Sequence, residues 1–292
     1  MTSSRIGLVG LGNMGAPVAA RLLQRGHRLL AHDISTERLR DVAKNGAETT
    51  AVLAELAGQC PVVLLSLPNP AAVRAVVDEL LEGAKPGLIV IDLSTNDPET
   101  ARDLARVAAT RGMAYIDAPV SGGPSRALTG ELTVMVGGDE QAVQKTLPLL
   151  SDIGAQVEYV GAAGAGSIAK LLNNYVALWG MVGVSQAFLA ALALDVSLDR
   201  LHEVMSRSSA RSYSLDRNFP KIRDKDFSPR FSLTLAQKDL RLGLELMRGA
   251  GLSVFAEKEL RSLFDASSGS DGELDVAVIY ERMARLSAAG KQ

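Results

Sequence analysis

Short apolar runs and amphipathic stretches alternate along the first half of the chain. Each apolar run ends near a Gly, Pro or Asp, and in the stretches between them apolar residues recur every three or four positions. This alternation predicts a parallel sheet whose strands are joined by crossover helices. The predicted strands are residues 5–10, 28–32, 61–66, 88–92, 114–118 and 132–137, and the predicted helices are residues 16–23, 70–81, 97–110 and 139–149.

The second half of the chain shows only helical periodicity. The predicted helices are residues 166–194, 197–207, 233–249, 254–268 and 274–286, with an irregular polar segment at residues 208–230 and a flexible loop at residues 267–272. We therefore predict an α/β fold in which a doubly wound sheet domain, residues 1–163, precedes an all-helical domain, residues 164–292. A long central helix joins the two.

That central helix contains the longest apolar run of the chain, from Leu171 to Leu194, without a charged side chain or a proline. The run has the length of a membrane span. Two asparagines, a serine and a glutamine inside it are costly in lipid, and the flanking loops show no Lys/Arg bias. We predict a helix buried on most sides within protein, with no membrane partner, in a homodimer or homotetramer that covers its apolar surface.

Composition narrows the class of protein further. The 292 residues are 47% hydrophobic and 22% charged, with a formal net charge of −2, which is ordinary for a soluble protein and gives no electrostatic reason to bind nucleic acid. The single cysteine, Cys60, excludes an intramolecular disulfide and fits a reducing compartment. The three histidines lie far apart and do not have the spacing of metal ligands. With no signal peptide ahead of the first strand, we expect a cytoplasmic protein without a metal.

A glycine-rich turn lies between the first predicted strand and the first predicted helix. It consists of Gly10, Leu11, Gly12, Asn13, Met14 and Gly15. The first glycine permits the tight turn, the second lets backbone N–H groups approach a pyrophosphate, and the third lets helix and strand pack closely. Asp33 follows the second strand, where a carboxylate meets the ribose hydroxyls and repels a 2′-phosphate. The turn predicts a dinucleotide site that prefers NAD, with NADP less expected.

Three later strand ends carry further candidates, because ligands of open α/β sheets bind beyond the carboxyl ends of the strands. Leu67, Pro68 and Thr95 are predicted to reach the cofactor. The turn from Ser121 to Gly123 offers a hydroxyl and bare backbone N–H groups, which can hold a carboxylate. From composition alone, each of these segments could also be an ordinary loop.

Lys170 stands at the head of the apolar helix, on the same face as Asn173 and Asn174. Taken by itself, Lys170 is either a lysine whose ammonium extends to the surface or a functional group held in a cleft. Arg211, in the irregular polar segment, is a candidate for holding an acidic group of the substrate, although a solvated surface arginine has the same signature.

Together, these motifs resemble the β-hydroxyacid dehydrogenase family, which includes 3-hydroxyisobutyrate dehydrogenases and tartronate semialdehyde reductases. The resemblance covers nearly the whole chain. It rests on the glycine turn, on Asp117-Ala-Pro-Val-Ser-Gly-Gly123, on Gly130 with Met135-Val-Gly-Gly138, on Gly164-Ala-Gly-Ser-Ile-Ala-Lys170-Leu-Leu-Asn-Asn174 and on Lys238-Asp-Leu240. It implies a Rossmann domain followed by a helical domain.

The resemblance also implies roles for single residues. Lys170 is implied as the catalytic residue, Ser121, Gly122, Gly123 and Asn174 as contacts of the substrate carboxylate and hydroxyl, and Lys238 as a cofactor contact. Ala72, where 3-hydroxyisobutyrate enzymes carry an asparagine, and the segment at residues 208–213 depart from the pattern of those enzymes. These departures leave the substrate open and do not affect the reaction class.

The reading that follows is hydride transfer between NAD and a small β-hydroxy acid, of the 3-hydroxyisobutyrate, glycerate/tartronate semialdehyde or serine type, in either direction. Lys170 would exchange the hydroxyl proton, since burial disfavours the charged form of lysine. A decarboxylating enzyme like 6-phosphogluconate dehydrogenase is the alternative, although the chain lacks the His-Asn pair expected after that lysine. Imine reduction would need another residue in place of Lys170. A non-catalytic dinucleotide-binding module would need Lys170 or the Ser121 turn to be lost.

Overall fold

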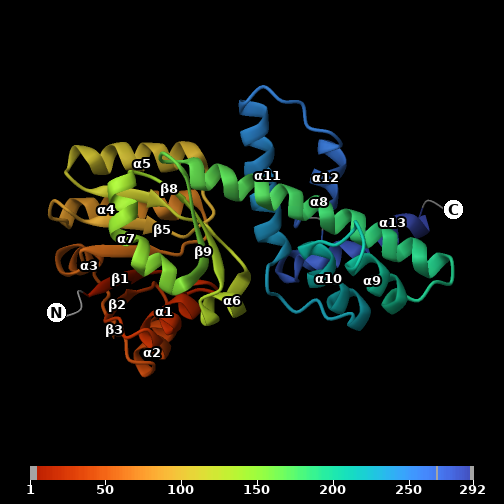
Figure 1. Ribbon diagram of the computed structural model, residues 1–292, viewed down its shortest axis with the longest axis horizontal. Coiled ribbons are helices and arrows are strands. Elements are labelled where there is room, and N and C mark those ends of the chain that lie inside the picture. Colours follow the sequence, from red (N-terminus) through yellow and green to blue (C-terminus); the bar gives the residue numbers. More distant parts are fainter. Residues whose placement is uncertain (1–4, 268, 290–292) are drawn as a thin grey trace. The chain divides into compact units, whose positions relative to one another are not determined.

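The computed structural model describes residues 5–267 and 269–289. The chain divides into two compact units, residues 1–170 and 171–292, which we describe separately (Figure 1). The division falls inside the long helix α8 (Ala165–Ala193), whose first turns cluster with the sheet of unit 1.

The described residues of unit 1 contain a nine-stranded sheet. Its strands are β1 (Ile6–Val9), β2 (Leu29–His32), β3 (Glu48–Thr49), β4 (Val62–Leu65), β5 (Ile89–Asp92), β6 (Ala114–Asp117), β7 (Val120–Ser121), β8 (Leu132–Gly137) and β9 (Gly154–Gly161). The spatial order is β3-β2-β1-β4-β5-β6-β8-β7, and β9 pairs with β8. The chain reverses its direction of winding between β1 and β4, which places the predicted dinucleotide site at the switch point of the sheet.

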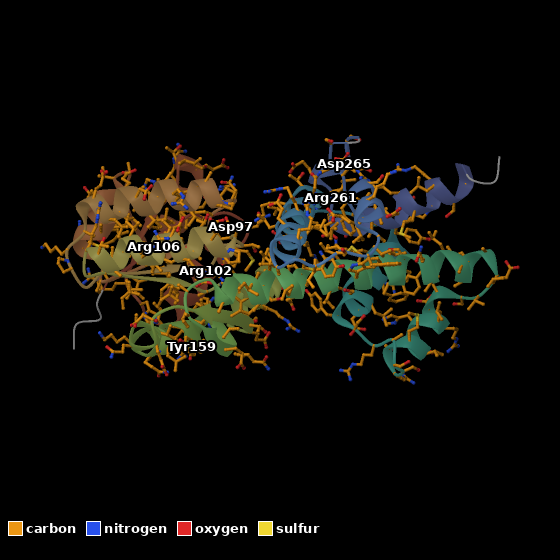
Figure 2. All side chains as sticks on the ribbon, turned by 90° about the horizontal axis from the view of Figure 1, so that it is seen from above. Asp97, Arg102, Arg106, Tyr159, Arg261 and Asp265 are labelled. Atoms are coloured by element: carbon orange, nitrogen blue, oxygen red, sulfur yellow. The ribbon has the colours of Figure 1, made fainter. Side chains whose placement is uncertain are left out.

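Seven helices cover the sheet within the described part of unit 1. They are α1 (Gly15–Gln24), α2 (Thr36–Lys44), α3 (Leu53–Gln59), α4 (Pro70–Gly83), α5 (Pro98–Thr110), α6 (Gly123–Thr129) and α7 (Glu140–Ile153). Asp97 caps α5, because its carboxylate accepts the Thr100 N–H at 2.8 Å (Figure 2).

Two apolar cores form, one on each face of the sheet. Residues of α1, α6 and α7 pack into one core, and residues of α3, α4 and α5 pack into the other. Along β4, Val63 and Leu65 belong to the second core and Leu64 to the first. A strand buried on both faces needs apolar residues at every position, which explains the continuous apolar runs of the sequence.

The sheet is not wholly parallel, and this corrects the prediction. The strands from β3 to β6 run parallel, but β8 runs antiparallel to both β6 and β7. The residues after Asp117, which were predicted from the sequence as a turn, contain the short strand β7 and lead into α6. β7 forms because it pairs with the long strand β8. Pro119, Gly122 and Gly123 are typical of irregular loops, so the sequence did not indicate this strand. α2, β3, α3 and β9 were also missed.

Unit 2 is helical in its described residues, as predicted. It contains the continuation of α8, then α9 (Leu198–Ser206), α10 (Tyr213–Asp224), α11 (Leu233–Gly249), α12 (Glu257–Leu263), two 3-10 turns (Asp271–Glu273 and Val276–Val278) and α13 (Ile279–Ala289). The predicted helix at residues 254–268 is shorter than expected, and its last residue lies outside the described residues.

The prediction that residues 208–230 are irregular is wrong, because helix α10 occupies the middle of this segment. Ser212 caps the helix, and its buried face carries Leu215, Phe219 and Ile222. Polar residues interrupt the apolar spacing of this helix, and Pro220 lies inside it, so periodicity alone did not reveal it.

The expected burial of α8 on most sides is also wrong for the single chain. In its most apolar 18-residue window, 33% of the residues are buried, although the helix is long and apolar enough by length and composition to cross a membrane. Leu172 and Val176 are 41% and 68% exposed. Such a surface is unusual for a monomer that functions alone in water.

Candidate active site

The glycine turn of unit 1 has the geometry that a dinucleotide pyrophosphate needs. Gly10 has φ +92°, and a Cβ on it would lie 2.2 Å from the carbonyl oxygen of Ser66. A Cβ on Gly15 would lie 1.8 Å from the Gly10 carbonyl oxygen, so only glycine permits this approach of α1 to β1. A Cβ on Gly12 would meet no atom within 4 Å. The space at Gly12 is therefore open, and the turn fits an NAD-type cofactor.

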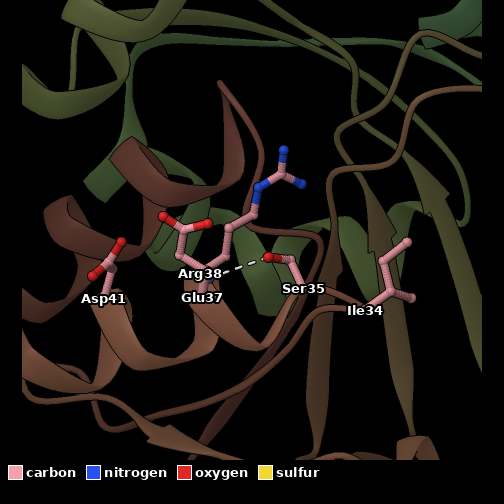
Figure 3. A pocket seen from close by; sticks show the side chains of 5 residues that line it. All are labelled: Ile34, Ser35, Glu37, Arg38 and Asp41. Carbon is pink, nitrogen blue, oxygen red and sulfur yellow. Dashed lines mark hydrogen bonds between the residues drawn. The ribbon is translucent and has the colours of Figure 1, made fainter.

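Asp33 lies directly after β2 and is buried. One carboxylate oxygen accepts the Leu11 N–H at 2.6 Å, and the other accepts the Ser35 N–H at 2.8 Å. Asp33 thereby ties the glycine turn to the segment that opens α2. The Arg38 guanidinium approaches it to 3.7 Å and lines, with Ile34, Ser35, Glu37 and Asp41, a pocket beside this segment (Figure 3).

The loops after β4 and β5 are linked by hydrogen bonds. The Ser94 hydroxyl accepts the Leu67 N–H at 2.8 Å, and Asp92 in turn accepts the Ser94 N–H at 2.9 Å and the Tyr115 hydroxyl at 2.8 Å. Burial raises the pKa of Asp92, although its hydrogen bonds oppose the shift. Thr95 is half-buried next to this network. The predicted cofactor positions Leu67, Pro68 and Thr95 therefore follow two strand ends that are held in fixed relation.

The loop after β6 carries the predicted substrate turn. Ser121, Gly122 and Gly123 are half-buried, and both glycines have positive φ, 132° and 78°. A Cβ on Gly123 would meet no atom within 4 Å. Asp117 ends β6 ahead of this turn, and its carboxylate accepts the N–H groups of Gly164 and Ser167 at 2.8 and 2.7 Å. Lys170 follows one turn later on α8 and is 8% exposed.

The predicted residues beyond Lys170 belong to unit 2. Asn174 on α8 donates its amide to a carboxylate oxygen of Asp239 at 2.7 Å, and the Lys238 ammonium lies 3.1 Å from the other oxygen. Asp239 is 3% exposed. The structure therefore brings Asn174 and Lys238 onto one carboxylate. Arg211 is exposed in the turn between α9 and α10, where its backbone N–H donates to the Ser208 carbonyl oxygen at 3.1 Å.

Two family models match the chain. The model described as the NAD binding domain of 6-phosphogluconate dehydrogenase matches residues 5–161, and the model described as the NAD-binding domain of NADP-dependent 3-hydroxyisobutyrate dehydrogenase matches residues 164–283. The 2-(hydroxymethyl)glutarate dehydrogenase of Eubacterium barkeri is 32% identical over 99% of each chain. The chain belongs to the β-hydroxyacid dehydrogenase family. The predicted fold and reaction class are thereby confirmed.

Solved structures of β-hydroxyacid dehydrogenase relatives agree with this placement. The 3-hydroxyisobutyrate dehydrogenase of Mycobacterium tuberculosis, solved with L-serine, superposes with a TM-score of 0.88 at 29% identity and covers 97% of this chain and 99% of its own. A protein titled Psf3, in complex with NADP+ and 2-OPP, superposes with a TM-score of 0.86 at 29% identity and covers 95% of this chain and 99% of its own. The chain is accordingly an NAD(P)-dependent oxidoreductase that acts on hydroxy acids.

Three buried aspartates of this β-hydroxyacid dehydrogenase were not among the predicted site residues. Asp92 and Asp117 are the last residues of β5 and β6, and Asp239 supports Asn174 and Lys238. A usable signal existed for the first two, because an acidic residue that ends an apolar strand lies at the carboxyl edge of the sheet. Asp239 was visible only as the neighbour of Lys238.

Proposed function

We propose that the chain catalyses the reversible NAD-dependent oxidation of a small 3-hydroxy acid to its semialdehyde. The observation that carries the proposal is the presence in unit 1 of the glycine turn, the Ser121–Gly123 turn and the buried Lys170. The candidate substrates are of the 3-hydroxyisobutyrate, glycerate and serine types.

The names of the relatives support one shared substrate skeleton. 3-Hydroxyisobutyrate, L-serine and 2-(hydroxymethyl)glutarate each carry a hydroxymethyl group on the carbon next to a carboxylate. They differ in the third substituent of that carbon, which is a methyl, an ammonium or a carboxyethyl group. We therefore propose a 2-substituted 3-hydroxypropanoate as substrate. The choice among such acids depends on polar partners for the third substituent, because a pocket discriminates weakly against a single methyl or hydroxyl group.

The residues of this chain would bind, orient and exchange a proton. When bound, the nicotinamide supplies the hydride chemistry. The backbone N–H groups of the Ser121–Gly123 turn would hold the carboxylate. The Lys170 amine would take the hydroxyl proton as the carbon–hydrogen bond breaks and would return it in the reduction. Asn174, one turn on along α8, would orient the same hydroxyl.

We also propose that NAD is preferred over NADP. Asp33 and Glu37 place two negative charges on the segment that follows β2, and Arg38 is the opposing positive charge in the pocket beside it (Figure 3). Asp41, which also lines the pocket, is paired with Lys44 at 2.7 Å. A 2′-phosphate would meet this excess of negative charge. The test is the ratio of kcat/KM values for the two cofactors. A higher value with NADP would contradict the proposal, and Arg38→Ala should lower activity with NADP more than with NAD.

A homo-oligomer is the third part of the proposal. The exposed apolar side chains of α8 support it, since Leu172 and Val176 would otherwise face water. Light scattering should report a dimer or tetramer at micromolar concentration. Val176→Glu should shift the mass toward the monomer, whereas a stable wild-type monomer would contradict the proposal.

Arg211 is proposed to help hold the acidic group of the substrate. Its guanidinium is exposed and suits a carboxylate. Arg211→Ala should raise KM for the hydroxy acid without changing the affinity for NAD. Arg207→Ala, which removes another exposed arginine of the same region, is the matched control. An unchanged KM for Arg211→Ala would end this assignment.

The deciding experiment for the proposed activity is a turnover assay with NAD. 3-Hydroxyisobutyrate, L-serine, D-glycerate and 2-(hydroxymethyl)glutarate are the substrates, and isobutanol, which lacks the carboxylate, is the control. We expect NADH to form with at least one acid and not with isobutanol. Equal turnover of isobutanol, or no turnover of any acid in either direction, would contradict the proposal. Release of carbon dioxide from 6-phosphogluconate would favour the decarboxylating alternative.

A further inference from the structure

A carboxylate of the sheet holds the turn of α8 that precedes Lys170. Asp117 is the last residue of β6, it is 1% exposed, and each of its oxygens accepts a backbone N–H from the start of α8. The Gly164 N–H donates to one oxygen at 2.8 Å, and the Ser167 N–H donates to the other at 2.7 Å. N–H groups in the first turn of a helix have no partner within the helix. Asp117 supplies that partner from a distant part of the sequence.

The same turn of α8 is packed tightly against the sheet. A Cβ on Gly166 would lie 2.3 Å from the Met135 carbonyl oxygen and 2.6 Å from the Asp117 carbonyl oxygen. A Cβ on Gly137 would lie 2.7 Å from the Gly166 nitrogen and 2.7 Å from a carboxylate oxygen of Asp117. The helix therefore starts in direct backbone contact with the ends of β6 and β8, and glycines make this approach possible.

Asp117 also begins the loop that leads to the substrate turn. The chain passes from Asp117 through Pro119, whose carbonyl oxygen accepts the Met135 N–H at 3.0 Å, to Ser121 in β7. One residue thus connects the Ser121–Gly123 turn to the helix that carries Lys170. The connection uses hydrogen bonds to backbone groups, which do not depend on the side-chain identities of residues 164 and 167.

Burial of the Asp117 carboxyl group disfavours its charged form. Burial raises the pKa of Asp117 to about 6, even though the N–H groups of Gly164 and Ser167 lower it. The ionised carboxylate is therefore a cost to the folded state at neutral pH. An asparagine of nearly the same shape would avoid that cost but would offer one oxygen where the helix presents two N–H groups.

We propose that Asp117 is a positioning residue for the reaction: its carboxylate fixes the start of α8, and with it Lys170, relative to the Ser121–Gly123 turn. The inference rests on the proposed catalytic role of Lys170. A proton-transfer group must lie within hydrogen-bond reach of the hydroxyl, so a small displacement of the first turn of α8 lowers the rate strongly. The glycine turn follows β1, which is separated from β6 by β4 and β5, so we expect NAD affinity to be unaffected by loss of this contact.

Asp117→Asn tests the proposal against Asp139→Asn as the matched control. Asp139 is exposed and accepts the Ala142 N–H at 2.9 Å, so it makes the same kind of contact within the start of its own helix, α7, and not with α8. At pH 7.5 we expect Asp117→Asn to lose about 10²-fold in kcat with an unchanged Kd for NAD. Asp139→Asn should keep both values. Hydrogen exchange at the Gly164 and Ser167 amides should accelerate only in Asp117→Asn.

A merely structural role predicts a different result. It would lower the thermal midpoint of Asp117→Asn but leave kcat intact at temperatures where the variant is folded, and that outcome overturns the proposal. Amide exchange does not depend on turnover, so it still tests the Asp117 contact if no hydroxy acid is oxidised and the proposed function fails. If Asp117→Asn does not fold, exchange in the wild-type protein decides: slow exchange at both amides supports the contact, and fast exchange contradicts it.

Discussion

The two units hold their candidate site residues in different ways. In unit 1, aspartates that end or follow β2, β5 and β6 accept backbone N–H groups, which belong to Leu11 and Ser35, to Ser94, and to Gly164 and Ser167, respectively. In unit 2, Asp239 binds the side chains of Asn174 and Lys238 instead. The contacts of unit 1 constrain the path of the chain, whereas those of unit 2 constrain the direction of single side chains. We therefore expect substitutions to act differently in the two units.

The largest expected effect is a loss of kcat, and it should follow substitution of Lys170 in unit 1 but not of Asn174 in unit 2. Lys170→Ala removes the proposed proton-transfer group and should lower kcat by about 10²–10⁴ with near-native NAD affinity. Lys170→Arg should not restore the rate, because a guanidinium does not release its proton. Asn174→Ala should act mainly on KM. Steady-state and single-turnover kinetics check both. If Lys170→Ala keeps more than about a tenth of kcat when chemistry limits the rate, Lys170 is not the proton-transfer group.

The second prediction concerns a buried ionic cluster of unit 2. Asp275 is fully buried, accepts the Arg217 guanidinium at 2.9 Å and lies 3.7 Å from the Lys221 ammonium. Asp275→Asn would leave buried cations without their counter-ion and should cost about 3 kcal/mol of unfolding free energy. Denaturant unfolding measures the loss, and the Kd for NAD should not change because the glycine turn belongs to unit 1.

The control for this cluster is an exposed ion pair of the same unit. Asp199 lies 3.8 Å from Arg223, and both side chains are largely in water. Asp199→Asn should therefore change the unfolding free energy by less than about 1 kcal/mol. An equally small effect of Asp275→Asn would show that the buried cluster does not stabilise unit 2.

Local sequence patterns indicate strand ends and turns of unit 1 but not its long-range contacts, and particular elements show why. The glycine turn and the ends of β4 and β5 follow local rules, so Gly10, Leu67 and Thr95 could be placed by position alone. The contact of Asp117 with residues 164 and 167 is long-range, and no local pattern encodes it. The antiparallel direction of β8 depends on its pairing with β7 for the same reason.

The helical unit posed a different difficulty. α11 was predicted with its observed bounds, because its apolar residues keep a regular helical spacing. The buried face of α10 includes the polar residues Ser214, Asn218 and Lys221, so its pattern resembles a surface segment. Two of these groups have partners outside α10: the Ser214 hydroxyl donates to the Ala177 carbonyl oxygen at 2.8 Å, and the Lys221 ammonium donates to the Ser228 carbonyl oxygen at 2.9 Å. Sequence periodicity does not show which buried polar residues have such partners, and for this reason it did not predict α10.

The third prediction uses pH to examine a strand-end aspartate of unit 1. Burial raises the pKa of Asp117 to about 6 in the folded state, above the ordinary aspartate value of 3.8. The folded state therefore binds the proton more tightly, and the stability contributed by this group is fully present below about pH 4 and is lost as pH rises through about 6. Relative to Asp117→Asn, wild-type protein should lose up to about 1.4 kcal/mol per pH unit in this window.

Unfolding free energies measured between pH 4 and 7.5 for wild type and Asp117→Asn check this sign. Groups common to both proteins cancel in the difference. Asp139→Asn, which replaces an exposed capping carboxylate, provides the reference curve. Parallel curves for wild type and Asp117→Asn would mean that the carboxyl of Asp117 has the same proton affinity in the folded and unfolded states. Ionisation of Asp117 would then not destabilise unit 1.

The smallest expected effect distinguishes two glycines of one turn in unit 1. Gly12 has open space at its Cβ position, so Gly12→Ala should change the unfolding free energy by less than about 1 kcal/mol. Its methyl group would occupy space that the pyrophosphate needs, and the Kd for NAD should rise about tenfold, or about 1.4 kcal/mol.

Gly15→Ala should instead destabilise unit 1, because its Cβ would lie 1.8 Å from the Gly10 carbonyl oxygen. Gly58→Ala, at another open position, should change neither affinity nor fold. Calorimetric titration with NAD and thermal unfolding separate the cases. If Gly12→Ala binds NAD as tightly as wild type, the cofactor does not approach the backbone at Gly12, and the hydrogen bond between Leu11 and Asp33 would order the turn for its own stability alone.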